Sequence, residues 1–266
     1  MLFPKTLCLI RGGGDLATGV AHRLHQSGFP VVVLELPQPR VVRRMASVAQ
    51  AVFDGQFVIG DLRARRAELP DVLPAALAGD IPVLVDPGGE TMAALRPSVV
   101  VDARLTKAPA DSTLDAASLV VGLGPGFVVG QNCHAVVETN RGHDLGRVLW
   151  AGAAQPDTGR PEPVLGFEGE RVLRAPAAGS LKAYAQIGDR LHTGDLIATV
   201  DGQAIAAPFP GVLRGLIHDG LPVAAREKIG DLDPRGQRRF CFTISDKSLA
   251  VGGGAVEAVL TWLGKL

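Results

Sequence analysis

A short apolar run that leads into a glycine-rich turn constrains the fold of this chain more than any other stretch. Thr6 to Ile10 is the apolar run, R-G-G-G-D-L-A-T-G follows it, and Leu16 to Gln26 has the pattern of a helix. Gly12, Gly14 and Ala17 match the G-x-G-x-x-A spacing. In a βαβ unit such glycines let the backbone approach a pyrophosphate at the start of the helix. The sequence therefore predicts a strand, a tight turn and a helix.

The residues around this turn leave two interpretations open. Glu35 ends the next apolar run about 20 residues beyond Gly14, a spacing that suits contact with a ribose hydroxyl. Asp15, by contrast, would repel a phosphate unless it caps the helix. A turn that binds a phosphate or nucleotide through Gly12, Gly13, Gly14 and Asp15 thus competes with a turn that needs glycine only for its geometry.

Further apolar runs, each followed by glycine or an acidic residue, predict a mostly parallel sheet. Ile81 to Val85 leads to Asp86, Val99 to Val101 leads to Asp102, and a third run enters the turn G-L-G-P-G-F. Parallel strands meet at one edge of an α/β sheet with their carboxyl ends, where such folds bind ligands. We expect a Rossmann-like α/β domain over residues 1–165. Its binding edge would include Lys107, Gly122, Gly124 and Gly126.

Two adjacent arginines, Arg43 and Arg44, follow the prolines of the next segment. They fit either a solvated helix face or an anion clamp over the strand ends, since guanidinium groups bind phosphate in a bidentate manner. We count both among the candidate ligand-binding residues.

The most polar stretch of the chain, E-T-N-R-G-H-D-L-G-R, begins at Glu138 and follows the second glycine turn. It combines acids, bases and anion-binding groups, so it is the best candidate for a functional site. The candidate catalytic residues are His143, Asp144 and Glu138. The candidate ligand-binding residues are Asn140, Arg141 and Arg147. Nearby, Cys133 is either a reactive thiol or a buried structural one, and His134 is either catalytic or packed.

The overall charge excludes some partners. With 27 basic and 27 acidic residues, the chain has no net field to attract nucleic acid or an anionic membrane. Three scattered cysteines indicate a reduced compartment, and no stretch reaches the roughly 20 apolar residues of a membrane helix. The sequence holds no complete zinc or iron signature. We expect a cytoplasmic protein without nucleic-acid or membrane partners.

An internal repeat marks a second module. Ala175-Pro176 is echoed by Ala207-Pro208, and Gly179 by Gly211, at an offset of 32 residues. The pattern resembles the barrel-sandwich hybrid of biotinyl and lipoyl domains, with two interlocking halves. Because Asp201-Gly202-Gln203 stands where those domains carry a modified lysine, we expect residues 166–240 to form such a module without a carrier lysine.

The last segment, residues 241–266, is predicted to add a strand and a helix that pack back on the first domain. A strand-like run from Arg239 to Ile244 precedes three glycines, Gly252 to Gly254, at the start of an apolar helix. Each glycine costs a helix up to about 1 kcal/mol relative to alanine, so the run implies close packing or a ligand.

Several motifs together resemble the YqeB-type family of selenium-dependent molybdenum hydroxylase system proteins. They are RGGGDLATG, ELPQPRVVRR, GLGPGF, HAVVETNRGHDLGR, RAPAAG, KIGDLDPRG and ISDKSLAVGGGAVEAVL. The resemblance implies an accessory role in the maturation of a molybdenum hydroxylase such as xanthine dehydrogenase. The implied ligand is molybdopterin or its cytosine dinucleotide, ahead of NAD(P) or another nucleotide.

Three functions stay open at this point. The chain could bind a phosphorylated pterin or its nucleotide form as an accessory protein. It could instead be a nucleotide-dependent oxidoreductase or transferase, with His143 as acid or base and Asp144 either orienting it or holding a metal. A third function is a non-catalytic assembly scaffold built on the repeat module. A homo-oligomer is compatible with each of them.

Overall fold

The computed structural model describes residues 1–106, 111–159 and 163–265, which fall into two compact units. The first unit comprises Met1–Pro37, Ser47–Asp157 and Ile244–Leu266. The second comprises Gln38–Ala46 and Thr158–Thr243. The structure differs from the expected boundaries at residues 38–46, which belong to the second unit although they lie within the range assigned to the first domain.

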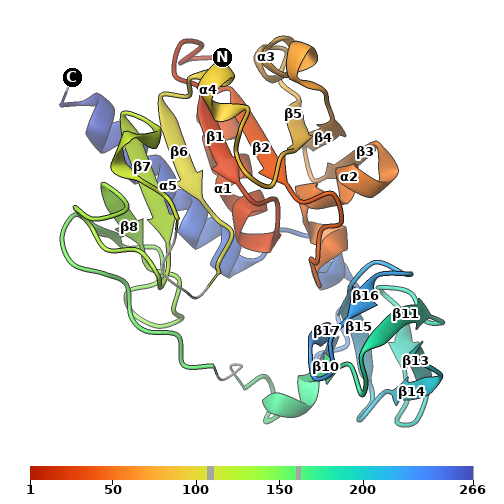
Figure 1. Cartoon of the computed structure of the whole chain (residues 1–266). Coiled ribbons are helices and arrows are strands. Elements are labelled where there is room, and N and C mark those ends of the chain that lie inside the picture. Colours follow the sequence, from red (N-terminus) through yellow and green to blue (C-terminus); the bar gives the residue numbers. More distant parts are fainter. Residues whose placement is uncertain (107–110, 160–162, 266) are drawn as a thin grey trace. The chain divides into compact units, whose positions relative to one another are not determined.

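The first unit is built on a nine-stranded sheet with the order β3-β4-β5-β2-β1-β6-β7-β8-β9 (Figure 1). Neighbouring strands from β4 to β8 all pair in parallel, while β3 and β9 pair antiparallel at the two edges. The strands are β1 Cys8–Arg11, β2 Val31–Glu35, β3 Gln56–Ile59, β4 Leu62–Arg66, β5 Ile81–Val85, β6 Val99–Asp102, β7 Leu119–Leu123, β8 Ala135–Val137 and β9 Val148–Leu149.

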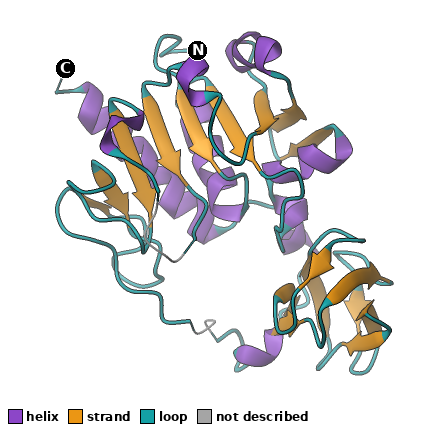
Figure 2. Ribbon diagram, viewed as in Figure 1, coloured by secondary structure: helices purple, strands orange, loops and turns teal. Residues whose placement is uncertain are grey.

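Valine-rich sequences explain why the central strands are parallel and covered on both faces. The runs VVVLE, VVVD and LVVGL are fully buried, as in sheets with helices on both sides. Leu9, Val32 and Val100 form one core cluster with Val72 and Leu95 of the helices α3 (Leu69–Leu77) and α4 (Met92–Leu95). The helices α1 (Asp15–Gln26) and α5 (Asp246–Leu263) cover the other face (Figure 2).

The glycine run of the last helix serves close packing. The helices α1 and α5 run in parallel, and a Cβ atom on Gly252 would lie 2.3 Å from the carbonyl oxygen of Gly19. A Cβ atom on Gly254 would lie 2.2 Å from the carbonyl oxygen of Gly146, whereas Gly253 meets no other atom within 4 Å. Of the two expected explanations for this run, close packing is therefore confirmed for Gly252 and Gly254.

The second unit contains two four-stranded antiparallel sheets, ordered β10-β17-β15-β12 and β14-β13-β11-β16. Its strands are β10 Val172–Arg174, β11 Gly179–Ala183, β12 Arg190–Leu191, β13 Leu196–Val200, β14 Gln203–Ala206, β15 Gly211–Leu216, β16 Pro222–Val223 and β17 Lys228–Asp233. The repeat is confirmed, since β11 and β15 begin at the equivalent glycines Gly179 and Gly211. The halves interlock because β12 pairs with β15 while β16 pairs with β11.

One local prediction is wrong, and one alternative that the sequence left open does not apply. The run from Arg239 to Ile244 forms no strand but begins with a 3-10 turn, η5 (Arg238–Cys241). Stacking of Arg239 on Phe240 and of Arg238 on Phe242 stabilises this turn, and Cys241 is buried beneath it. The segment after Pro39 is no continuous helix either. It divides into the short elements η1 Arg44–Ala46, η2 Val48–Gln50 and α2 Ala51–Asp54.

The remaining short elements are the 3-10 turns η3 Leu114–Ala116 and η4 Gly169–Arg171. Within the described parts of the chain, no helix is both long and apolar enough to cross a membrane.

Candidate functional site

The first glycine turn, between β1 and α1, is packed on both sides by backbone. Gly12 has a φ of +91°, and a Cβ atom on it would lie 3.3 Å from the carbonyl group of Ala103. A Cβ atom on Gly13 would lie 3.1 Å from the backbone nitrogen of Ala49. Gly14 is the N-cap residue of α1. Close approach of neighbouring backbone thus accounts for Gly12 and Gly13 without a ligand.

Glu35, at the end of β2, is hydrogen-bonded to this turn. Its Oε2 accepts a hydrogen bond from the backbone N–H of Gly13 at 2.6 Å, and its Oε1 accepts one from Leu36 at 2.7 Å. Burial raises the pKa of Glu35 although both backbone hydrogen bonds act in the opposite direction. The carboxylate therefore engages an amide of the turn that a bound pyrophosphate would otherwise use.

Asp15 links the starts of the two parallel helices. Its Oδ1 accepts a hydrogen bond from the hydroxyl of Ser248 at 2.9 Å, while Ser245 caps α5 by accepting from the backbone N–H of Ser248 at 3.2 Å. Asp15 thus has a structural partner at the helix start, where its charge is also favourable.

A charged cluster lies where the strand order of the sheet reverses, between β1 and β6. Open α/β sheets bind ligands at such a point, beyond the carboxyl ends of the strands. Arg11 and Asp102 are opposite each other in the register of β1 and β6. Asp102, which is 1% exposed, accepts hydrogen bonds from Arg104 Nε at 3.0 Å and from the hydroxyl of Ser112 at 2.5 Å.

The two arginines of this cluster share one anionic partner, Asp111. Arg11 Nη1 lies 3.3 Å from Asp111 Oδ1, and Arg104 Nη2 donates to the same oxygen. Burial alone would lower the pKa of Arg104, but hydrogen bonds to Asp102 and Asp111 raise it above its usual range. Both guanidinium groups are therefore fixed cations at the carboxyl edge of the sheet.

Asp86, beyond β5, organises the loop that follows it. Its carboxylate accepts hydrogen bonds from the backbone N–H groups of Gly89, Glu90 and Thr91 and from the Thr91 hydroxyl, at distances from 2.6 to 3.1 Å. Burial acts to raise the pKa of Asp86, but these hydrogen bonds outweigh it and lower the pKa. Asp86 is thus a loop cap rather than a free ligand group. Lys107, expected at the same edge, lies outside the described residues.

The second glycine turn is also packed tightly. A Cβ atom on Gly122 would lie 2.1 Å from the ring of Phe127, and one on Gly124 would lie 2.3 Å from the hydroxyl of Thr139. Gly126 has a φ of +99°, and its carbonyl oxygen accepts a hydrogen bond from Asn132 Nδ2 at 3.0 Å. Packing and turn geometry therefore explain all three of these predicted binding glycines.

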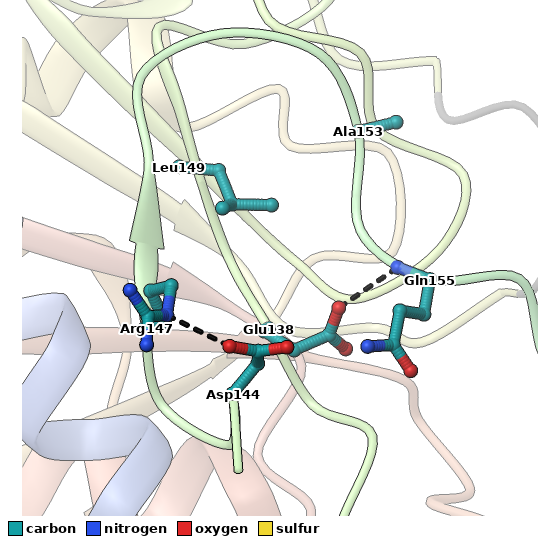
Figure 3. A pocket seen from close by; sticks show the side chains of 6 residues that line it. All are labelled: Glu138, Asp144, Arg147, Leu149, Ala153 and Gln155. Carbon is teal, nitrogen blue, oxygen red and sulfur yellow. Dashed lines mark hydrogen bonds and ion pairs between the residues drawn. The ribbon is translucent and has the colours of Figure 1, made fainter. Parts of the chain in front are cut away.

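A hollow of about 380 Å³ lies beside β8 and β9 (Figure 3). Its lining residues are Glu138, Asp144, Arg147, Leu149, Ala153 and Gln155. Three of them belong to the predicted polar stretch. Gln155 was missed because it comes from a loop without a motif. The hollow combines charged groups with an apolar wall.

The buried carboxylate of Glu138 connects two loop segments at this hollow. Its Oε1 accepts from the backbone N–H of Asn140 at 2.7 Å, and its Oε2 accepts from that of Gln155 at 2.8 Å. Glu138 is only 2% exposed. Two amide partners and this burial make it a structural acceptor that fixes the loop.

The expected pairing of His143 with Asp144 does not form. Asp144 Oδ1 lies 2.9 Å from Arg147 Nε, and Figure 3 shows these two side chains facing each other. His143 is exposed to solvent. Because Asp144 is engaged by an arginine, it does not orient the imidazole in this structure.

The remaining polar residues of the stretch bind other parts of the first unit. Asn140 Nδ2 donates to Gln155 Oε1 at 2.7 Å. Arg141 forms a bidentate ion pair with Asp246, at the start of α5, with distances of 2.9 and 3.0 Å. These contacts fix the loop to α5.

Arg43 and Arg44 belong to the second unit and donate to its backbone. Arg43 Nη2 donates to the carbonyl oxygens of Phe240 at 2.9 Å and Thr243 at 3.2 Å. Arg44 Nε donates to that of Leu216 at 3.1 Å. Neither arginine is on a solvated helix face, and their contacts are those of structural cross-links.

Cys133 and His134, which come before β8, are structural. Burial raises the pKa of the Cys133 thiol to about 11, so little thiolate forms near neutral pH. His134 Nδ1 accepts a hydrogen bond from the backbone N–H of Val120 at 2.9 Å. Across residues 1–106, 111–159 and 163–265, no group of three or more His, Cys, Asp or Glu side chains could hold a metal ion.

Sequence reasoning missed Arg11, Asp111 and Ser112 as members of the charged cluster. Arg11 carried a signal, because it directly precedes the first glycine turn at the predicted end of a strand. Asp111 and Ser112 lie in a loop, where no periodicity places a side chain.

The chain is similar to a curated protein of Escherichia coli (strain K12) named Uncharacterized protein YqeB. The two are 45% identical over 255 residues, which is 96% of this chain. The chain spans about half of that relative, 47% of its length. No protein-family model matches the chain.

Solved structures with some likeness have low identity. An aspartoacylase family protein from Mesorhizobium loti is 12% identical with a TM-score of 0.28, and the match covers 85% of this chain and 84% of that one. The apo ectoine utilization protein EutE (DoeB) from Ruegeria pomeroyi is 11% identical with a TM-score of 0.26, over 85% of this chain and 86% of that one. The activities that these names state belong to the named proteins and are not assigned to this chain.

Proposed function

Because this chain belongs to the YqeB-type family, we propose that it is an accessory protein for the maturation of a selenium-dependent molybdenum hydroxylase. In this role it binds a phosphorylated or nucleotide-bearing ligand at the carboxyl edge of its parallel sheet. The ligand is the molybdenum cofactor, as molybdopterin or its cytosine dinucleotide, and it is cargo rather than a resident cofactor.

One observation carries the proposal of a phosphate-bearing ligand. Two guanidinium groups, from Arg11 and Arg104, converge on a single carboxylate oxygen where the strand order reverses. Planar guanidinium groups match the oxygens of a phosphate group as they match those of a carboxylate. The same two arginines can therefore receive a phosphate or pyrophosphate group.

The fit differs from a typical dinucleotide site. The Gly13 amide is engaged by Glu35, so the first glycine turn offers fewer N–H groups to a pyrophosphate. Side-chain cations rather than glycine amides would then provide most of the attraction. This favours a phosphorylated pterin held by arginines over NAD(P) held by the turn.

For the finer fold, we assign a Rossmann-like arrangement to the first unit and a barrel-sandwich hybrid to the second. Support for the second comes from the 32-residue repeat and from the exchange of short strands between its halves. The hairpin between β13 and β14 carries Asp201-Gly202-Gln203 and no lysine. The module would then be a docking surface for the hydroxylase, for example xanthine dehydrogenase.

A nucleotide-dependent oxidoreductase or transferase is the alternative. It needs an acid or base at the site, and His143 is the exposed imidazole nearest in sequence to the hollow. The contact of Asp144 with Arg147 removes the partner expected to orient that imidazole. Unchanged turnover in a His143→Ala variant would exclude His143 from the chemistry.

The test of the accessory function is direct binding. Calorimetric titration of the purified chain with molybdopterin cytosine dinucleotide is expected to show saturable heat at micromolar ligand. An absence of binding heat or of saturation would contradict the proposal. A scaffold role is tested separately by co-purification with the hydroxylase, which should be lost when residues 168–238 are deleted from a chain that still folds.

A further inference from the structure

The charged cluster between β1 and β6 contains an oxygen atom that already accepts from two arginines. Arg11 Nη1 is 3.3 Å from Asp111 Oδ1, and Arg104 Nη2 donates to the same atom. One anionic oxygen between two guanidinium groups is the arrangement found where proteins bind phosphate. The oxygen here comes from the protein itself.

The two arginines are fixed in place. The side chain of Arg11 is 8% exposed, and its Nη2 donates to the carbonyl oxygen of Gly88 at 3.4 Å. Arg104 is held by Asp102, which accepts from its Nε at 3.0 Å and from its backbone N–H at 3.2 Å. Both cations therefore keep their positions if Asp111 is removed.

Asp111 is held far less firmly. Its side chain is 70% exposed, and its contact with Arg104 is exposed to solvent. Ion pairs at exposed positions contribute only about 0–1 kcal/mol. A competing anion with more charge and more oxygens can displace such a carboxylate at little cost.

We propose that Asp111 occupies the place of a phosphate oxygen, and that a phosphate-bearing ligand binds between Arg11 and Arg104 by displacing it. This inference rests on the proposed function and specifies its phosphate subsite. With Asp111 turned away, Arg11, Arg104 and Asp102 leave one net positive charge facing the ligand. Asp111 then sets the affinity, because each ligand must compete with it.

A mutation that removes the charge of Asp111 should therefore increase the affinity for the ligand. Removal of an acidic residue that contacts two binding arginines should strengthen binding rather than weaken it. Asp111→Asn keeps the shape of the side chain but removes its charge, so it should bind a phosphate group roughly threefold to tenfold more tightly than the wild type. Asp111→Ser should behave in the same way.

The test is isothermal calorimetry with inorganic pyrophosphate, with cytidine diphosphate and with cytidine. Pyrophosphate and cytidine diphosphate should both bind, and both should bind more tightly to Asp111→Asn and Asp111→Ser. Cytidine without phosphate should gain nothing from either change. Asp61→Asn is the matched control, because it also removes one exposed negative charge. Asp61 contacts His22 and Gln26, which lie in the last turns of α1.

The results of this titration distinguish a failure of the Asp111 proposal from a failure of the proposed function. Equal affinities of wild type and both Asp111 variants for pyrophosphate overturn the inference, while measurable binding leaves the proposed function standing. A gain in Asp61→Asn as large as that in Asp111→Asn also overturns it, since the effect would then be one of net charge alone. No binding of any phosphate compound to any variant contradicts both.

Discussion

The carboxylate of Glu35 accepts a hydrogen bond from the backbone N–H of Gly13 at 2.6 Å, across the first glycine turn. One of the two interpretations of the sequence spacing put this acid beside a ribose and this amide beside a pyrophosphate. In the structure the two groups bind each other. The turn is thereby fixed from inside the protein.

Glu35→Ala is expected to destabilise the protein. It leaves the backbone N–H groups of Gly13 and Leu36 without their buried acceptor, which costs about 1–3 kcal/mol of unfolding free energy. Chemical denaturation measures the change. Glu257→Ala, at an exposed position of α5, is the control and should differ little from the wild type. Equal stability of the two variants would show that the Glu35 contact contributes nothing.

Substitution of two neighbouring glycines of α5 by alanine should change the stability of the protein in opposite directions. Gly252→Ala places a Cβ atom 2.3 Å from the Gly19 carbonyl oxygen, and overpacking of this kind costs about 1–3 kcal/mol or more. Gly253→Ala meets no neighbouring atom within 4 Å, so it should stabilise the helix by up to about 1 kcal/mol. Thermal unfolding of the two variants tests this, and a shift of the same sign in both would contradict the parallel packing of α1 and α5.

The glycine run illustrates what the sequence could predict. Three consecutive glycines in an apolar helix signal either a close approach or a ligand, because nothing else offsets their cost. The partners could not be predicted, since Gly19 and Gly146 are distant in sequence and no periodicity connects them to α5. The valine-rich strands, by contrast, are local signals, and they predicted the parallel sheet correctly.

Glu138 and His143 are expected to differ sharply in their effect on stability. Glu138→Ala removes the acceptor of two backbone N–H groups at a position that is 2% exposed, and should cost about 1–3 kcal/mol. His143→Ala changes an exposed side chain and should stay within about 0.5 kcal/mol. Urea denaturation of both variants decides the point. A stability loss for His143→Ala equal to that for Glu138→Ala would contradict the structural role of the carboxylate.

The pH dependence of stability should include a contribution from Asp86. Its hydrogen bonds lower its pKa in the folded protein, so the ionised form is favoured by folding. That contribution is present above the ordinary pKa of about 4 and is lost as the pH falls through the lower folded value. The free energy of unfolding should therefore decline more steeply below about pH 4 in the wild type than in Asp86→Ala. If the free energy of unfolding declined equally in both proteins, protonation of Asp86 would not be linked to folding.

The candidate site was harder to predict than the fold. The polar stretch from Glu138 to Arg147 does line a hollow, but most of its charges are paired within the protein. Sequence reveals which polar groups are close along the chain, whereas pairings such as Arg141 with Asp246 depend on tertiary contacts. Arg11, Asp111 and Ser112 of the charged cluster were missed for the same reason, because Arg11 is distant in sequence from the other two residues.

We expect a phosphate-bearing ligand to bind at the carboxyl edge of the sheet, between β1 and β6. The most direct test compares the dissociation constants of molybdopterin cytosine dinucleotide for the wild type, Arg104→Gln and Arg63→Gln. Arg63 is the control, because it is an exposed arginine of β4 that pairs with Asp80. We expect Arg104→Gln to bind the ligand at least about tenfold more weakly, a loss of about 1.4 kcal/mol, and Arg63→Gln to bind it with unchanged affinity. Equal affinity of Arg104→Gln and the wild type would contradict this expectation.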